Sequence, residues 1–179
     1  MPLRYDPAVI ALHWLTVLLV AAAAGLGLAM VPMEPSVEKL QWYSWHKWVG
    51  TTVFGLTLLR LAWRWLVPAP PPLALPAWQR LAAAATHHLL YLLLLALPLT
   101  GWVMTSAYGF PVVYLGLWQI PDLVAPDNAL GDRFAAIHRW LGYLMALLLA
   151  LHAGAALKHH LMDRDATLAR MVPGLRPRS

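Results

Sequence analysis

The chain has 179 residues, of which 60% are hydrophobic and only 12% are charged, and its formal net charge is +5. A soluble domain of this size is much less apolar, so the composition excludes a soluble globular protein and favours one built inside a membrane. The absence of cysteine excludes disulfides, thiolate-bound iron–sulfur clusters and covalently attached c-type haem.

Four apolar segments follow one another along the chain, each near the ~20 residues that cross ~30 Å of hydrocarbon. The first helix is expected at about residues 7–30, where Pro32 and Pro35 end it. A second helix at 37–67 leads into a stiff, proline-rich linker. A third at 77–106 is kinked at Pro98, and a long loop at 108–131 precedes the fourth at 132–161. These elements predict an all-α, transmembrane four-helix bundle that forms a single domain over residues 1–179.

The excess positive charge indicates membrane topology rather than nucleic-acid binding. In a four-helix threading most basic residues fall on one side, and the positive-inside rule then places both termini of a multi-pass membrane protein in the cytoplasm. The residues on that side are Arg4, Arg60, Arg64, Arg80, Lys158, Arg164, Arg170, Arg176 and Arg178. The other side carries Lys39, Lys47, Arg133 and Arg139 together with most of the acidic residues.

Two histidines, His138 and His152, lie fourteen residues apart on the fourth helix, with no charge over residues 140–151. That spacing returns the side chain to within roughly 40° of the same face and moves it roughly 21 Å along the axis. A histidine in an apolar membrane segment is functional by default. On each of the other three helices, a histidine and the residue fourteen positions after it define two depths in the same way. The outer layer contains Gly27, His46, Gly101 and His138, and the inner layer contains His13, Arg60, His87 and His152.

The two layers predict two non-covalent haems stacked across the bilayer, each with its iron held between two imidazoles. In the outer layer only His46 and His138 are available as ligands. The inner layer offers three histidines. The repeat on the fourth helix favours His152 with His13 from the first helix, and leaves His87 as a second-sphere group or an alternative ligand.

Other positions in these layers have expected roles beside the haems. Arg60 lies at the depth where it can neutralise a haem propionate. Gly27 and Gly101 are expected to leave room for the flat haem ring. Met145 lies midway between His138 and His152 and is expected to fill the gap between the two rings.

His159 follows His152 by seven residues, which places it on the same helix face about 10 Å further out. It is therefore a candidate proton donor or acceptor at a quinone site on the cytoplasmic side. The chain contains no glycine-rich nucleotide loop, so a one-electron donor is expected rather than a hydride donor.

Several motifs together resemble bacterial cytochrome b561, the family that includes the membrane superoxide oxidase. They are Arg4-Tyr5 before the segment 10–14, His46 on the second helix, Arg60 with Arg64, His87 with Ala96-Leu97-Pro98, the tract 151–160, and Thr167-Leu168-Ala169-Arg170-Met171. The resemblance implies a protein of the bacterial inner (plasma) membrane with two b haems, periplasmic superoxide as electron donor and ubiquinone as acceptor near the cytoplasmic haem. It also supports the two ligand pairs above.

The resemblance also raises two points about the substrates. The superoxide oxidase type carries lysines in the proline-rich linker, whereas this linker has none, so Arg80 or His159 would have to take their place at the quinone. Lys47, Arg133 and Arg139 flank the outer ligands and are expected to attract a small anion such as superoxide.

Two alternatives belong to other functional classes. The chain can instead be an electron-carrying subunit that links a dehydrogenase, a hydrogenase or a soluble cytochrome to the quinone pool, with the loop 108–131 as its docking surface for a protein redox partner. A histidine-rich di-metal enzyme such as a desaturase needs clustered histidines at one membrane face. The division of the histidines between two depths argues against that enzyme.

Overall fold

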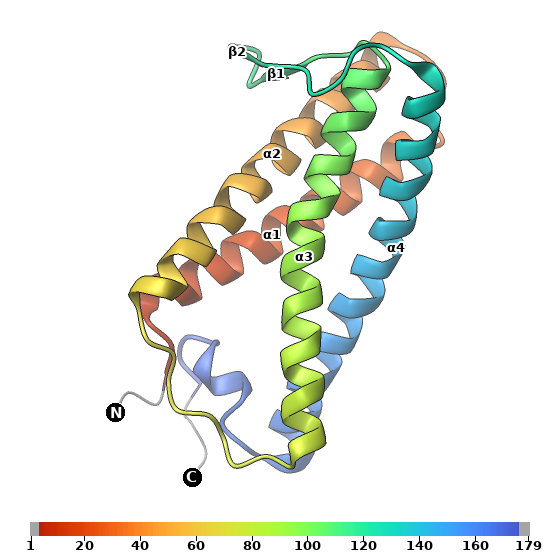
Figure 1. Ribbon diagram of the computed structural model, residues 1–179. Helices are drawn as coiled ribbons and strands as arrows, with labels where there is room; N and C mark the ends of the chain where they lie inside the picture. Colours follow the sequence, from red (N-terminus) through yellow and green to blue (C-terminus); the bar gives the residue numbers. More distant parts are fainter. Residues whose placement is uncertain (1–3, 176–179) are drawn as a thin grey trace.

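The computed structural model describes residues 4–175, so Arg176 and Arg178 lie outside the described residues. It confirms the predicted all-α bundle (Figure 1), whose helices are α1 (Pro7–Met30), α2 (Val37–Leu66), α3 (Ala77–Ala107) and α4 (Asn128–Lys158). Within the described residues, α1, α3 and α4 with its continuation to Asp163 are long and apolar enough to cross a membrane. The second helix, α2, is as long as these but holds Lys47 and Arg60 within it.

Side-chain caps explain where three of the helices begin. Asp6 accepts the Ala8 N–H before α1, and Ser36 accepts the Lys39 N–H before α2. Asp127 accepts the Leu130 N–H, so α4 begins at Asn128 and not at the predicted residue 132. A carboxylate at this position stabilises a helix start because it satisfies a free backbone N–H.

The helices pack as two hairpins, α1 against α2 and α3 against α4, with α2 meeting α3 between them. The buried core lies between the two histidine layers and consists of Val53, Leu90, Leu93, Leu94, Met145 and Leu148. Met145 is seven residues from both His138 and His152 and is 5% exposed, so it fills the space midway between the layers. The large apolar side chains that cover the outside are suited to contact with lipid.

The segment expected as an irregular loop contains a β-hairpin of β1 (Val112–Tyr114) and β2 (Trp118–Ile120), which pair antiparallel with Val113 opposite Gln119. Tyr114 pairs with Trp118, so a three-residue loop of Leu115, Gly116 and Leu117 joins the strands, and its first two residues have positive φ. The hairpin is fixed to α2, because Trp48 Nε1–H donates to the Val113 carbonyl over 2.6 Å.

The chain closes the opposite end of the bundle with its C-terminal segment. After α4 it continues as a π-helix (His159–Asp163) and then a 3-10 helix (Leu168–Arg170). Arg170 is buried, and its Nη1–H donates to the Pro71 carbonyl of the proline-rich linker over 2.8 Å. Trp14 Nε1–H donates to the Met171 carbonyl, and Arg4 bonds the carbonyl of Leu175. Both ends of the described chain therefore lie at this end of the bundle.

Candidate functional site

The two outer histidines face each other across the gap between the hairpins. The rings of His46 on α2 and His138 on α4 have centroids 6.1 Å apart. His46 Nδ1 lies 2.9 Å from the Ala23 carbonyl of α1, and His138 Nδ1 lies 3.0 Å from the Leu97 carbonyl of α3. Because a carbonyl can only accept, each Nδ1 carries the hydrogen and each Nε2 keeps its lone pair. Both rings are thus held in the tautomer that binds a metal through Nε2.

A glycine lies beneath each outer imidazole. A Cβ on Gly27 would lie 3.3 Å from Cε1 of His46, and a Cβ on Gly101 would lie 3.3 Å from Cε1 of His138. In both helices the carbonyl that accepts the Nδ1 hydrogen belongs to the residue four positions before the glycine. In the structure these glycines border an imidazole, and the expectation that they make room for a flat haem ring stays a prediction. They let an imidazole lie directly on the neighbouring helix and reach its backbone.

The inner layer brings three histidines together around His152. Its ring centroid is 6.3 Å from that of His13 and 5.3 Å from that of His87. Arg60 reaches the same cluster, with Nη2 3.4 Å from His13 Nδ1 and its guanidinium 5.3 Å from the centre of the Tyr91 ring. Both His13 and His87 are close enough to pair with His152, so the choice between them rests on experiment.

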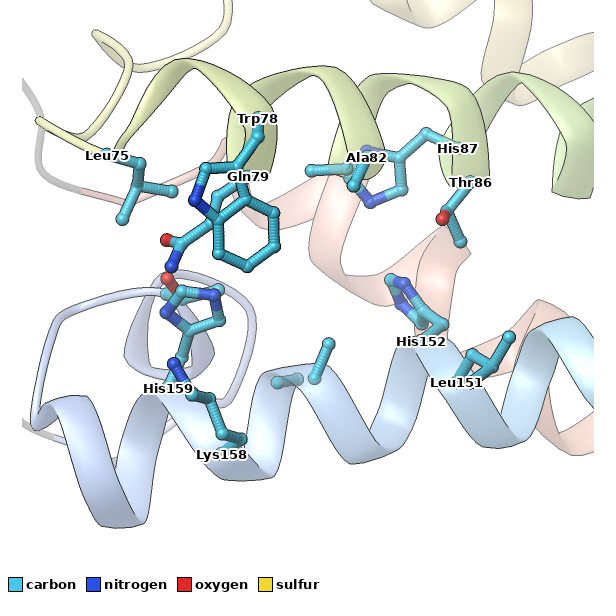
Figure 2. Close-up of a pocket in the computed structure, with 14 residues that line it drawn as sticks. Leu75, Trp78, Gln79, Ala82, Thr86, His87, Leu151, His152, Lys158 and His159 are labelled. Carbon is cyan, nitrogen blue, oxygen red and sulfur yellow. The ribbon is translucent and has the colours of Figure 1, made fainter.

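A cavity of about 260 Å³ opens between the first half of α3 and the end of α4. Figure 2 shows His152 of α4 and His159, the first residue after α4, projecting toward α3, where Trp78, Gln79 and His87 face them. The rest of the lining is mostly leucine and alanine. The cavity therefore connects the inner histidines with His159, and its walls suit a flat, largely apolar ring with polar atoms at its edge.

Arg80 was expected at this quinone site but does not line the cavity. Its side chain is exposed, and Nη1–H donates to the Leu75 carbonyl over 2.7 Å. It is held on the outer surface of α3 by the turn before it, so we leave it out of the candidate site. His159, by contrast, lies at the cavity wall.

Sequence reasoning missed one residue beside the cavity, Asp165. Its carboxylate lies 2.7 Å from His159 Nδ1. A separation of six residues is not a same-face spacing on an α-helix, so no helical pattern could have indicated this contact.

The three basic residues on the outer side differ in their surroundings. Lys47 Nζ donates to the Pro111 carbonyl over 3.0 Å and thus also fixes the segment before β1. Arg133 and Arg139 are exposed. All three belong to the outer half of the bundle, where His46 and His138 lie. Lys47 directly follows His46, and Arg133 and Arg139 are within five residues of His138 in the sequence.

Comparison with known proteins identifies the family to which the chain belongs. The prokaryotic cytochrome b561 family matches residues 4–174. Similar proteins include cytochrome b561 homolog 2 of Escherichia coli K12, 36% identical over 96% of this chain and 92% of the relative, and cytochrome b561 homolog 1, 35% identical over 95% and 97%. The probable superoxide oxidase CybB of Yersinia pestis is 30% identical over 95% of this chain and 96% of its own length. The chain belongs to the prokaryotic cytochrome b561 family.

Proposed function

We propose that this chain is a di-haem oxidoreductase that carries electrons from superoxide on the periplasmic side to ubiquinone on the cytoplasmic side. Its family transfers electrons within membranes and binds b haem, and the chain is a protein of the bacterial inner membrane. The observation that carries the proposal is the arrangement of histidines in two facing sets at two depths, with a cavity beside the inner set.

The residues fit two axially ligated haems. His46 and His138 are the outer pair, because each already presents Nε2 with Nδ1 bonded to a backbone carbonyl. His13 and His152 are the proposed inner pair, with His87 beside them as second-sphere group or alternative ligand. When bound, the haems supply one-electron transfer along the bundle axis.

Arg60 is the proposed partner of an inner propionate. Its guanidinium lies within the inner cluster, stacked on Tyr91 and 3.4 Å from His13. A partly buried guanidinium among histidine side chains needs an anion to compensate its charge. A propionate meets that need with charge-assisted hydrogen bonds.

The cavity between α3 and α4 is the proposed quinone site. A quinone needs a flat apolar slot and a proton donor at a carbonyl oxygen, and here leucine and alanine side chains supply the slot and His159 the donor. The same end of the bundle carries Arg4, Arg64, Arg80 and Arg170, so the positive-inside rule places it, with both termini, in the cytoplasm.

Superoxide is the proposed donor for two reasons. One relative is named as a probable superoxide oxidase, whereas the two E. coli relatives are named only as cytochrome b561 homologs. In addition, Lys47, Arg133 and Arg139 place positive charge near the outer pair, which favours a small anion.

A stopped-flow experiment tests the proposed reaction with superoxide. The oxidised holoprotein is mixed with superoxide at increasing salt, and haem reduction is followed. Steering by exposed charge weakens with a Debye length of roughly 10 Å at 0.1 M salt, so the rate should fall as salt rises. A Lys47→Gln/Arg139→Gln double variant should be slower at low salt with unchanged haem content. A rate that responds to neither salt nor the variant would contradict steering by these residues.

The second candidate is an electron-carrying subunit that receives electrons from a periplasmic redox protein. The hairpin favours it, because Leu117 at its tip is 88% exposed and Trp118 is 75% exposed. Apolar side chains presented on a protruding hairpin are suited to a protein contact. In the same stopped-flow experiment this candidate predicts no haem reduction by superoxide at any salt concentration.

A further inference from the structure

His159 is held by carboxylates at the end of α4. Its Nδ1 lies 2.7 Å from Asp165 Oδ2 and 3.1 Å from Asp163 Oδ2, and its side chain is only 13% exposed. The second oxygen of Asp165 accepts the Thr167 N–H over 2.7 Å. Both oxygens of Asp165 are therefore engaged, which fixes the direction from which it approaches the imidazole.

The backbone brings Asp165 back to His159 by an unusual route. The segment His159–Asp163 is a π-helix, and Arg164 follows with φ 55° in the left-handed region. The Arg164 and Asp165 N–H groups both donate to the His159 carbonyl, the latter over 3.1 Å. A π-helical turn and a left-handed arginine are strained features of the kind that occur at functional sites. Here they reverse the chain so that a carboxylate six residues away meets the ring.

The other edge of the imidazole is turned toward the cavity. Since Nδ1 is bonded to Asp165, the nitrogen available to a molecule in the cavity is Nε2. Figure 2 shows the His159 ring beside Gln79 and Trp78 of α3, with His152 further along the same wall. A ring molecule in the cavity would lie between the inner histidines and His159.

We propose that Asp165 is a positioning residue for proton delivery: it holds His159 so that Nε2–H points at a quinone carbonyl oxygen in the cavity. The inference rests on the proposed quinone reductase function and deepens it. The ionised carboxylate also stabilises the imidazolium form of His159, which is the form that can give up the proton. Asp165 itself keeps its charge throughout.

The proton balance is as follows. A quinone becomes a quinol by taking two electrons, which superoxide supplies in the proposed function, and two protons. The Nε2–H bond of the His159 imidazolium breaks, and an O–H bond forms at the nearer carbonyl oxygen. His159 is left neutral, with Nδ1–H still donating to Asp165, and cytoplasmic water returns the proton to Nε2. Water supplies the second proton to the other carbonyl oxygen.

The surrounding charges favour Asp165 over Asp163 in this role. Lys158 Nζ lies 2.6 Å from the same Asp163 oxygen that faces His159, so most of that carboxylate's charge is compensated. Burial tends to raise the pKa of Asp165, but hydrogen bonds from Thr167 and His159 outweigh it and lower that pKa below its usual value. The titratable groups around His159 are Lys158, Asp163 and Asp165 at the end of α4, and His152 and His87 along the cavity.

The test compares Asp165→Asn with Asp163→Asn as a matched control. Each holoprotein is reduced with dithionite, freed of the excess, and mixed anaerobically with a short-chain ubiquinone over a range of pH. We expect ubiquinone to reoxidise the Asp165→Asn protein about tenfold more slowly than the wild type at neutral pH. A positioned general acid accelerates a reaction about 10²-fold or more, so loss of its positioning should be measurable. The pH dependence of the variant's rate should also differ from that of the wild type. Asp163→Asn should keep the wild-type profile, and Asp165→Glu should recover much of the rate.

Two further measurements separate positioning from a structural effect. Ferricyanide takes an electron without a proton, so it should reoxidise all variants equally, and haem content should be unchanged. Nitrogen NMR of labelled histidines should show that the hydrogen bond from His159 Nδ1–H is weaker in Asp165→Asn than in the wild type.

A wild-type reoxidation rate and pH profile in Asp165→Asn would overturn the role of Asp165 while leaving quinone reduction intact. A wild-type protein that ferricyanide reoxidises but ubiquinone does not would overturn both the quinone site and this inference.

Discussion

The glycine beneath each outer histidine leads to a specific prediction for the Gly27→Ala variant. The new Cβ would lie 3.3 Å from Cε1 and 3.6 Å from Nδ1 of His46, so the ring must move by a few tenths of an ångström. Its hydrogen bond to Ala23 is already 2.9 Å long, and a shift outward carries it toward the ~3.2 Å limit of a good N–H···O bond.

The expected effect is on haem affinity more than on folding. Losing the buried hydrogen bond costs about 1 kcal/mol, and alanine returns up to about 1 kcal/mol of helix propensity, so the two nearly cancel in the free energy of unfolding. Loss of the group that orients a metal ligand typically weakens metal binding about 10–100-fold. Gly27→Ala should therefore fold normally and hold the outer haem more weakly by that factor.

The assay is transfer of haem from the purified protein to an excess of apomyoglobin, with haem content measured by pyridine haemochrome. Gly25→Ala is the matched control, because it lies on the same helix and a Cβ there meets nothing within 4 Å. Gly101→Ala should weaken the same haem as Gly27→Ala, since it displaces His138 in the same way. If Gly27→Ala retained the outer haem as tightly as Gly25→Ala does, the role assigned to the glycines beneath the outer histidines would be refuted.

The remaining predictions concern haem number and ligation. The two layers predict two b haems per chain, and a pyridine-haemochrome value of one haem or none would contradict them. His46→Ala and His138→Ala should each remove the same outer haem and spare the inner one, because an iron that loses an axial bond inside the bilayer finds no replacement ligand. His13→Ala and His152→Ala should do the converse, as seen in reduced-minus-oxidised spectra. If His87→Ala removed the inner haem while His13→Ala spared it, His87 would be the second inner ligand.

The depth of each polar group could be predicted from the sequence because the rise of an α-helix is fixed. Counting fourteen residues brought His46 level with His138, and His13 and Arg60 level with His152, and the structure places each of these groups together. Counting residues cannot say which group touches which. The hydrogen bonds of His46 and His138 to backbone carbonyls depend on how closely the helices of each hairpin approach, and so the contacts of Gly27 and Gly101 with these imidazoles could not be predicted.

Two other features had no usable sequence signal. The hairpin loop is Leu115-Gly116-Leu117, and Leu115 adopts a positive φ that leucine rarely takes, so the usual Asn-Gly or Asp-Gly signal is absent. The contact of Asp165 with His159 depends on a π-helical turn and a left-handed Arg164, neither of which follows from helical periodicity. In both places tertiary contacts override local preference: Trp48 and Lys47 hold the hairpin segment, and His159 holds Asp165.

The net reaction tests the central claim most directly. The purified holoprotein is given ubiquinone and a steady supply of superoxide, and quinol is measured against the superoxide consumed. The proposed function predicts one quinol for every two superoxide anions, abolished by superoxide dismutase and by His46→Ala. Quinol that forms equally without the protein, or haem that superoxide cannot reduce while a periplasmic redox protein can, would contradict it.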